Sequence, residues 1–140
     1  MTDNLFETIS SNPSPQPQTH FFFIEKNGDL STLSSLKDGL KAVELGGYLW
    51  LDYCDPNLET LQPLITELNI HPLSIEDVLN EDQLPKLDLF PNYSFMVFNV
   101  FESTDTEVIT HELDFFIGAN FIISTSRRNR AGQPILAGVE

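Results

Sequence analysis

Two adjacent carboxylates, Glu76 and Asp77, are the side chains of this sequence whose types and spacing best suit a chemical role. Carboxylate oxygens are hard ligands of the kind that Mg²⁺ prefers, and this ion needs only one or two of them because it keeps several of its waters. Two neighbouring acids offer too few ligands for a strong site. We therefore expect a weak regulatory site for a divalent cation, with Asp77 as its principal ligand and Glu76 as the second.

A short helix must position this pair, because two prolines bracket the segment His-Pro-Leu-Ser-Ile-Glu-Asp-Val-Leu-Asn-Glu-Asp-Gln-Leu-Pro-Lys at residues 71–86. Pro72 suits the first helical position, where no backbone N–H is required, and Pro85 favours an extended conformation for the residue before it. At 3.6 residues per turn, Glu76 and Asp77 lie about 100° apart and project toward solvent or a neighbour. The residues expected to face inward are Leu73, Val78 and Leu79.

Three other interpretations of the acidic pair stay open. The acids could simply favour the N-terminal turn of the helix through its macrodipole, by about 0.3–1 kcal/mol. Metal-assisted hydrolysis by Glu76, Asp77 and Asp88 is the enzymatic alternative, but the sequence has no nucleophile beside a base, no phosphate-binding glycine loop and no zinc motif. We expect a protein that is not an enzyme. A soluble interaction module that works without metal is the third alternative.

The segment resembles the signature of the cytoplasmic N-terminal domain of CorA-type magnesium and cobalt channels, which runs His-Pro-Leu-x-x-Glu-Asp-x-Leu-Asn-x-x-Gln-Arg-Pro-Lys. Leu84 departs from the arginine of that pattern, and Asp82 departs from a frequent histidine. The resemblance is clearest between Gly47 and Arg127. The matching positions are His71, Pro72, Leu73, Glu76, Asp77, Leu79, Asn80, Gln83, Pro85 and Lys86.

The resemblance implies a regulatory domain that senses divalent cations and gates a pore outside this chain. In such channels, which are homopentamers, the acidic pair faces carboxylates on a long helix of the adjacent subunit. A bound Mg²⁺ bridges them and holds the pore shut. The partner helix is missing here, so we expect Asp77 and Glu76 to bind Mg²⁺, or Co²⁺ or another divalent cation, only feebly. A zinc-transporting branch of the family is an alternative, and the fragment itself is expected to be a monomer or weak dimer.

Composition agrees with a cation-binding domain. The 140 residues are 41% hydrophobic, which is normal for a globular fold, and 21 acidic against 7 basic residues give a net charge of −14. Such a charge repels nucleic acid and anionic lipid and attracts cations. The sole cysteine, Cys54, fits a reducing cytoplasm. No signal peptide and no run of 18 apolar residues is present, so we expect a soluble fragment. Its parent would lie on the cytoplasmic side of the cell membrane, which it would meet only through a missing C-terminal part.

The chain divides into three segments. Residues 1–19 are rich in proline, serine and glutamine and predict a flexible lead. Residues 20–127 form the CorA-like α/β domain, and residues 128–140 begin the connection to the absent helical and transmembrane parts. Within the domain we expect helices at residues 36–45 and from Pro56 to Leu68, the latter capped by Asp55.

Strands are expected at residues 20–25, 30–33, 48–54, 94–101, 111–117 and 121–125. Several of them, such as 48–54, are apolar on both faces and must be covered on both. The predicted fold class is therefore α/β, a three-layer α/β/α sandwich around a mixed, partly antiparallel sheet of about six to seven strands.

Overall fold

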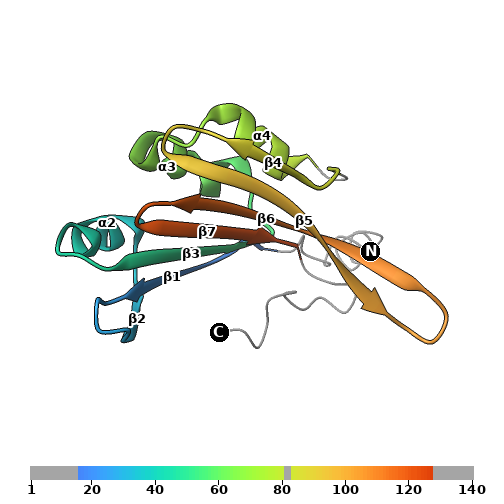
Figure 1. Cartoon of the computed structure of the whole chain (residues 1–140), viewed down its shortest axis with the longest axis horizontal. Coiled ribbons are helices and arrows are strands. Elements are labelled where there is room, and N and C mark those ends of the chain that lie inside the picture. Colours follow the sequence, from blue (N-terminus) through green and yellow to red (C-terminus); the bar gives the residue numbers. More distant parts are fainter. Residues whose placement is uncertain (1–15, 81–82, 128–140) are drawn as a thin grey trace, which may run out of the picture.

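One sheet organises the part of the chain that the computed structural model describes, residues 16–80 and 83–127. Its strands are β1 (Gln18–Ile24), β2 (Leu30–Leu33), β3 (Tyr48–Cys54), β4 (Lys86–Leu89), β5 (Tyr93–Ser103), β6 (Val108–Gly118) and β7 (Phe121–Ser126). They lie in the order β2-β1-β3-β7-β6-β5-β4, with β3 and β7 parallel and every other pair antiparallel. The helices are α2 (Leu36–Glu44), α3 (Leu58–Leu68) and α4 (Pro72–Leu79). The predicted α/β class and the mixed sheet are confirmed (Figure 1).

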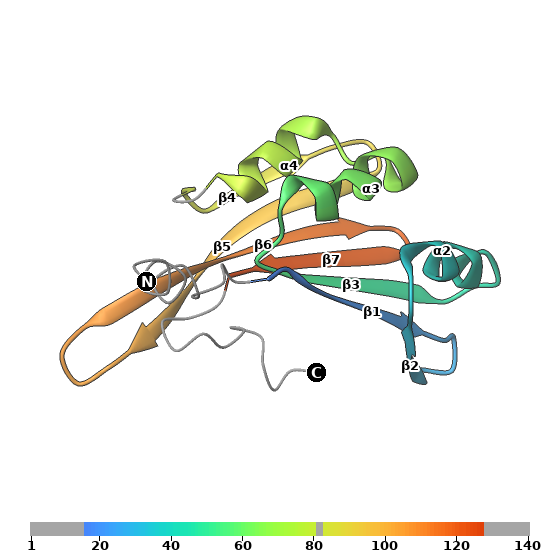
Figure 2. The same cartoon turned by 180° about the vertical axis from the view of Figure 1, so that it is seen from behind.

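All three described helices pack on the same face of the sheet, as both side views show (Figures 1 and 2). Strand register puts Leu51, Ile123 and Phe116 on this face, and each is fully buried in one cluster with residues of all three helices. Close approach needs a small residue in α2, because a Cβ added at Gly39 would lie 2.7 Å from a methyl carbon of Leu49. The core therefore lies between this face and the helices.

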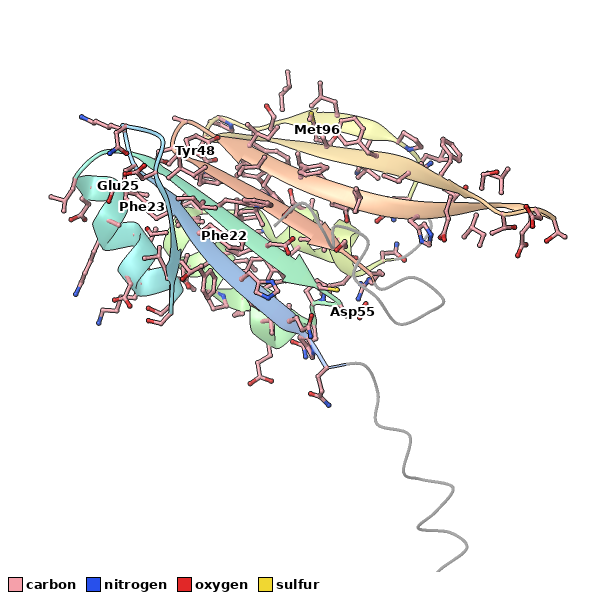
Figure 3. All side chains as sticks on the ribbon, turned by 90° about the horizontal axis from the view of Figure 1, so that it is seen from below. Phe22, Phe23, Glu25, Tyr48, Asp55 and Met96 are labelled. Atoms are coloured by element: carbon pink, nitrogen blue, oxygen red, sulfur yellow. The ribbon has the colours of Figure 1, made fainter. Side chains whose placement is uncertain are left out.

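The opposite face of the sheet has no helix on it among the described residues. Its side chains are nevertheless largely apolar, and Figure 3 looks onto this face, with Phe22, Tyr48 and Met96 labelled. Leu89 is 76% exposed there. Of the three expected layers, the described residues therefore form the sheet and the helical layer on one of its faces. The large hydrophobic residues exposed on this face are Leu30, Leu87, Leu89, Phe98, Val100 and Ile117.

Helix α3 begins later than the sequence suggested. Asn57, not Asp55, is its N-cap: the Asn57 carboxamide accepts from Thr60 N and the Thr60 hydroxyl accepts from Asn57 N, both at 2.9 Å. Asp55 instead has a φ of 50°, in the left-handed region that asparagine and aspartate tolerate. The predicted cap was therefore wrong, because Asp55 makes the turn from β3 into the helix and does not start the helix itself.

The sheet is larger than the sequence predicted. Strand β4, which the sequence reading omitted, pairs antiparallel with β5 and forms one edge of the sheet. Strands β5 and β6 form a long hairpin. Its outer part, from Asn99 to Ser103 and Val108 to Glu112, pairs with no other strand among the described residues and projects past the rest of the sheet (Figure 2).

Candidate metal centre

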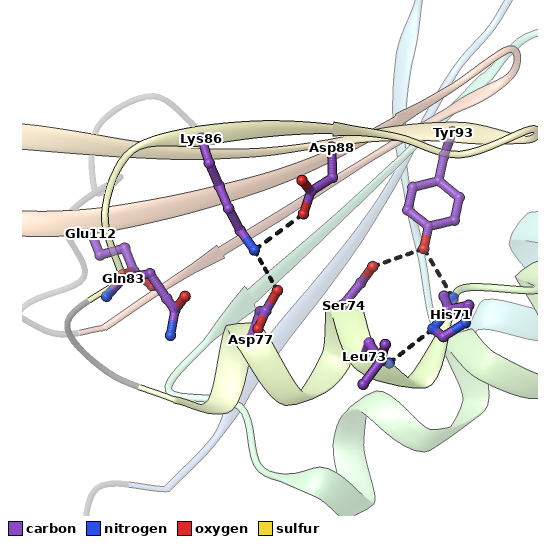
Figure 4. Close-up of polar contacts among 9 residues, drawn as sticks. All are labelled: His71, Leu73, Ser74, Asp77, Gln83, Lys86, Asp88, Tyr93 and Glu112. Carbon is purple, nitrogen blue, oxygen red and sulfur yellow. Dashed lines mark hydrogen bonds and ion pairs between the residues drawn. The ribbon is translucent and has the colours of Figure 1, made fainter.

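The signature segment begins with a tightly bonded helix start. The His71 ring accepts a hydrogen bond from Leu73 N through Nδ1 at 3.1 Å, which caps α4, and Pro72 occupies the first turn as predicted. The Tyr93 hydroxyl accepts from His71 N at 3.0 Å and lies 2.9 Å from the Ser74 hydroxyl. One buried phenol on β5 therefore fixes where α4 starts (Figure 4). The contacts of His71 are therefore those of a helix-entry residue.

Helix α4 turns Ser74, Ile75 and Val78 toward the sheet, and all three are buried. Leu79 packs against the core as predicted. Leu73 does not, since its side chain is 61% exposed. Leu73 lies two residues before Ile75, or about 200° around the helix, and so points away from the sheet. The hydrophobic pattern predicted the wrong inward residue, because Ser74 takes the inward position and its hydroxyl bonds to that of Tyr93.

Asp77 points toward the sheet edge and holds a lysine. Lys86 Nζ on β4 lies 2.6 Å from Asp77 Oδ2 and 3.1 Å from Asp88 Oδ2 (Figure 4). The hydrogen bond that Lys86 donates to Asp77 raises the pKa of the Lys86 ammonium, and Asp88 adds to this. Each of the three side chains keeps 29–43% of its surface exposed. Two carboxylates from different elements thus converge on one cationic group that water can reach.

Glu76 does not join them. Its side chain is exposed, and its place one residue before Asp77 directs it away from Lys86. The acidic pair also lies outside the first turn of α4, which contains no acid. The macrodipole interpretation is therefore wrong, because a carboxylate near the C-terminal end of a helix meets its negative pole. No group of three or more metal-ligating side chains occurs in residues 16–80 and 83–127.

The end of α4 is tied to the sheet by polar groups that the sequence reading missed. Arg127 donates to the carbonyls of Val78 at 3.4 Å and Pro56 at 3.3 Å. Glu112 Oε1 accepts from Gln83 N, just after the helix, at 2.9 Å. Leu84, which stands where the CorA signature has arginine, is 82% exposed. Glu81 and Asp82, expected to add charge here, lie outside the described residues.

Beneath α4 lies a β6–β7 polar cluster, which we define as Glu112, Asp114, Thr125 and Arg127. Asp114 is 3% exposed, and its Oδ2 accepts from the Thr125 hydroxyl at 3.3 Å. The pKa of Asp114 is raised to about 8, mainly by burial and also by Glu112, while Thr125 and Arg127 oppose the rise. In the sequence, the signal that could have identified this buried acid is its place within the apolar run Leu-Asp-Phe-Phe-Ile.

A second buried acid invites comparison with a catalytic triad. Asp52 accepts from the Ser124 hydroxyl at 2.7 Å and lies 3.7 Å from His20 Nδ1. Ser124 in turn accepts from the Trp50 indole at 3.0 Å. In a triad the histidine stands between serine and aspartate, so that it can take the serine proton. Here the aspartate stands in the middle, and the arrangement serves to satisfy a buried carboxylate.

None of the helices in the described ranges is both long and apolar enough to cross a membrane.

The chain is similar in sequence to a family of known proteins. The family described as CorA-like Mg²⁺ transporter protein matches residues 46–134, well over half of the chain. The chain is 32% identical to YfjQ of Bacillus subtilis (strain 168), whose name groups it with metal ion transporters, over 77 residues that make up 55% of this chain and 24% of YfjQ. It is 33% identical to magnesium transporter ALR2 of Saccharomyces cerevisiae (strain ATCC 204508 / S288c) over 54 residues, 39% of this chain and 6% of that protein.

Solved structures share the fold. The full-length CmaX protein superposes with a TM-score of 0.65 at 15% identity, covering 86% of this chain and 37% of CmaX. The soluble domain of CorA from Methanocaldococcus jannaschii gives a TM-score of 0.55 at 16% identity, covering 79% of this chain and 41% of that domain. The chain therefore spans less than half the length of each of these proteins, and it shares with them the arrangement of strands and helices described above.

Proposed function

Because this chain belongs to the CorA-like Mg²⁺ transporter protein family, we propose that it is the cytoplasmic regulatory domain of a magnesium channel, with a pore that lies outside this chain. It senses cytoplasmic divalent cations where subunits meet. Asp77 is the principal ligand on this side of the interface, and Glu76 is the second. The domain works by binding and not by catalysis.

One observation carries the proposal: two carboxylates from α4 and β4 already surround a cation. Lys86 Nζ lies between Asp77 and Asp88 at 2.6 and 3.1 Å, at an edge of the sheet that water reaches. A divalent cation at Asp77 would take the place of this ammonium. It would attract the carboxylates in the same way, but with twice the charge. Lys86 then acts as the counter-ion that occupies Asp77 when no metal is bound.

Two carboxylates are too few for a strong site, so the adjacent subunit must supply further oxygen ligands from the long helix that lies outside this chain. Without the ion, carboxylates of adjacent subunits repel each other within about 8 Å, the Debye length at physiological salt. Loss of the ion therefore favours separation of the subunits and opening of the pore. Several weak sites suffice, because a channel needs only a few kcal/mol of preference for its closed state.

The open face of the sheet supports a larger assembly. Leu87, Leu89 and Phe98 are exposed there, and an exposed apolar surface of this kind marks a contact. We propose that the helices which family members carry after this domain cover that face and supply the third layer. The same face also suits a metal-independent interaction module, which is the second candidate function. The transported ion, whether Mg²⁺, Co²⁺ or, in a zinc-transporting relative, Zn²⁺, is set by the pore.

Thermal unfolding at rising Mg²⁺ concentration tests the proposed site. Binding to the folded state alone raises stability, by about 1.4 kcal/mol when free ion is ten times the dissociation constant. We expect a small stabilisation of the wild type beyond an ionic-strength control in KCl, and its loss in Asp77→Ala. Lys86→Met should respond at lower Mg²⁺ concentration, because its competing ammonium is gone. Sedimentation at the same Mg²⁺ concentrations reports whether copies associate.

Asp105→Ala is the matched control, since Asp105 is an exposed acid in the turn of the distant β5–β6 hairpin. It should keep the full response to Mg²⁺. An equal response in wild type and Asp77→Ala would show that the ion binds elsewhere. No response in stability or sedimentation, together with tight binding of a helical peptide to the open face, would favour the interaction module.

A further inference from the structure

The β6–β7 polar cluster contains a buried acid whose hydrogen bonding is incomplete. Asp114 Oδ1 has no hydrogen-bond partner among the residues that the structure describes, while Oδ2 receives only the Thr125 hydroxyl at 3.3 Å. A buried, ionised carboxylate with so few partners is costly, and such a group usually keeps its proton. When Oδ1 is protonated, Asp114 can instead donate this proton in a hydrogen bond.

Glu112 is a nearby acceptor for that proton, since it is one of the groups that raise the pKa of Asp114. It lies two residues from Asp114 on β6, so both side chains project from the same face of the sheet. Continuing the β6–β7 pairing by one residue beyond Leu113 and Ser126 brings Arg127 opposite Glu112. Two acids and one guanidinium therefore meet beneath α4. A single proton leaves one negative charge facing one positive charge.

Arg127 nevertheless directs its hydrogen bonds away from the acids. Its guanidinium donates to the carbonyl of Val78, in the last turn of α4, and to that of Pro56, just before α3. Both carbonyls belong to segments that pack on the sheet but are not part of it. Arg127, which directly follows β7, thus ties the end of α4 and the segment before α3 to the sheet.

We propose that Asp114 and Glu112 share one proton and that this proton operates a latch on helix α4. While the proton is held, Arg127 stays on the Val78 and Pro56 carbonyls and α4 is fixed. When the proton leaves to solvent, the second carboxylate charge draws the guanidinium toward the acids, and the C-terminal turn of α4 is released. The latch makes the position of α4 sensitive to pH whether or not Asp77 binds an ion.

Among the residues that the structure describes, the charged groups around the pair come from three places. Arg127, which directly follows β7, interacts with Asp114. Lys86 on β4 lies on the same face, since Val97 pairs with both Lys86 and Asp114, and Asp77 on α4 holds that lysine. Strand β5 presents no titratable side chain beside Asp114. Of these, Arg127 is the one cation whose hydrogen bonds reach both α4 and the segment before α3.

The sign of the pH dependence follows from the pKa of Asp114, which is raised from 3.8 to about 8 in the folded protein. Between these values the folded state binds more protons than the unfolded state, so stability falls as pH rises and levels off above about pH 8. This is opposite to the behaviour of an ion-paired surface acid, which stabilises a protein as pH rises.

Thermal unfolding between pH 5 and 9, in EDTA so that no divalent ion takes part, tests the latch. We expect the midpoint temperature of the wild type to fall through this range relative to Asp114→Asn, which imitates the protonated acid and should lack the transition. Asp105→Asn, an exposed acid, should follow the wild type. Carboxyl carbon NMR should place the titration of Asp114 near pH 8. Parallel curves for wild type and Asp114→Asn would overturn the proposal.

Two further variants separate a latch from a merely structural acid. Glu112→Gln removes a neighbour that raises the pKa of Asp114 and should move the transition to lower pH, whereas Arg127→Met removes a neighbour that lowers it and should move the transition to higher pH. Amide exchange in α4 at pH 9 should be several-fold faster in the wild type than in Asp114→Asn. Equal exchange, or shifts of the two transitions in the same direction, would also overturn the latch, and neither result bears on ion binding at Asp77.

Discussion

Helix α4 stands between two acidic clusters of the same composition, each with two carboxylates and one cation. On its outer side Asp77 and Asp88 hold Lys86 at 2.6 and 3.1 Å. On its inner side Glu112 and Asp114 lie beside Arg127, which bonds to backbone carbonyls at 3.3 and 3.4 Å instead. The same three charges are therefore arranged in two different ways within one small region.

Solvent explains the difference. At the edge, water solvates both carboxylates, so both can lie against one lysine, which in the proposed function gives way to a divalent cation. Under α4, Asp114 is 3% exposed and a second negative charge cannot be solvated, so a proton neutralises it. Under the two proposals made above, one helix would respond to metal ions on its exposed side and to protons on its buried side.

Removing each cation in turn is the strongest test of this contrast. Arg127→Met should lower the free energy of unfolding by about 2–4 kcal/mol at pH 7, because it leaves the charge of the acid pair without a cation and removes the donor to the Val78 and Pro56 carbonyls. Lys86→Met should lower it by only about 0–1 kcal/mol, as for other exposed pairs. Urea unfolding measures both. Equal losses would mean that the two clusters are equally solvated, and the contrast would fail.

The hydroxyl of Tyr93 sets the position of α4 between the two clusters. Tyr93→Phe should cost about 1–3 kcal/mol, because His71 N and the buried Ser74 hydroxyl both lose their partner. Tyr48→Phe is a matched control, since that phenol bonds only to carbonyls of the Gly118–Phe121 turn, and its loss should leave α4 undisturbed. Amide exchange distinguishes them: only Tyr93→Phe should speed exchange in α4. Equal exchange in both variants would contradict this role.

Much of the fold followed from local sequence rules. Pro72 marked the start of α4 correctly because a proline fixes its own backbone and needs no N–H at the first helical position, and the helix ends at Leu79, before Pro85. The apolar run at β3 identified a buried strand, which ends in the buried Cys54. Asp55 misled because a good capping residue also tolerates the left-handed turn it occupies here.

The surroundings of the candidate site could not be predicted in the same way. Asp77 was identified from the family signature, but its contact with Lys86 depends on β4 lying next to the helix, and this short strand was not predicted. The β6–β7 polar cluster depends on strand register: Asp114 and Arg127 meet only because β7 turns back along β6. Local patterns give the elements, while such contacts arise from their pairing.

The smallest expected effect sharpens the description of the wet side. Asp77→Asn and Asp88→Asn should each change the free energy of unfolding by about 0–1 kcal/mol in dilute buffer, with the larger loss at Asp77, whose oxygen lies nearer to Lys86. In 1 M NaCl, where the Debye length is about 3 Å, both losses should nearly vanish. The loss of stability in Asp77→Asn should be smaller than the short distance to Lys86 suggests, because the Asp77 carboxylate also lies near the negative, C-terminal end of the α4 dipole. A loss of several kcal/mol that persists in high salt would show that Lys86 is a structural partner and not an exchangeable counter-ion, and Asp77 would then be poorly placed to sense a metal.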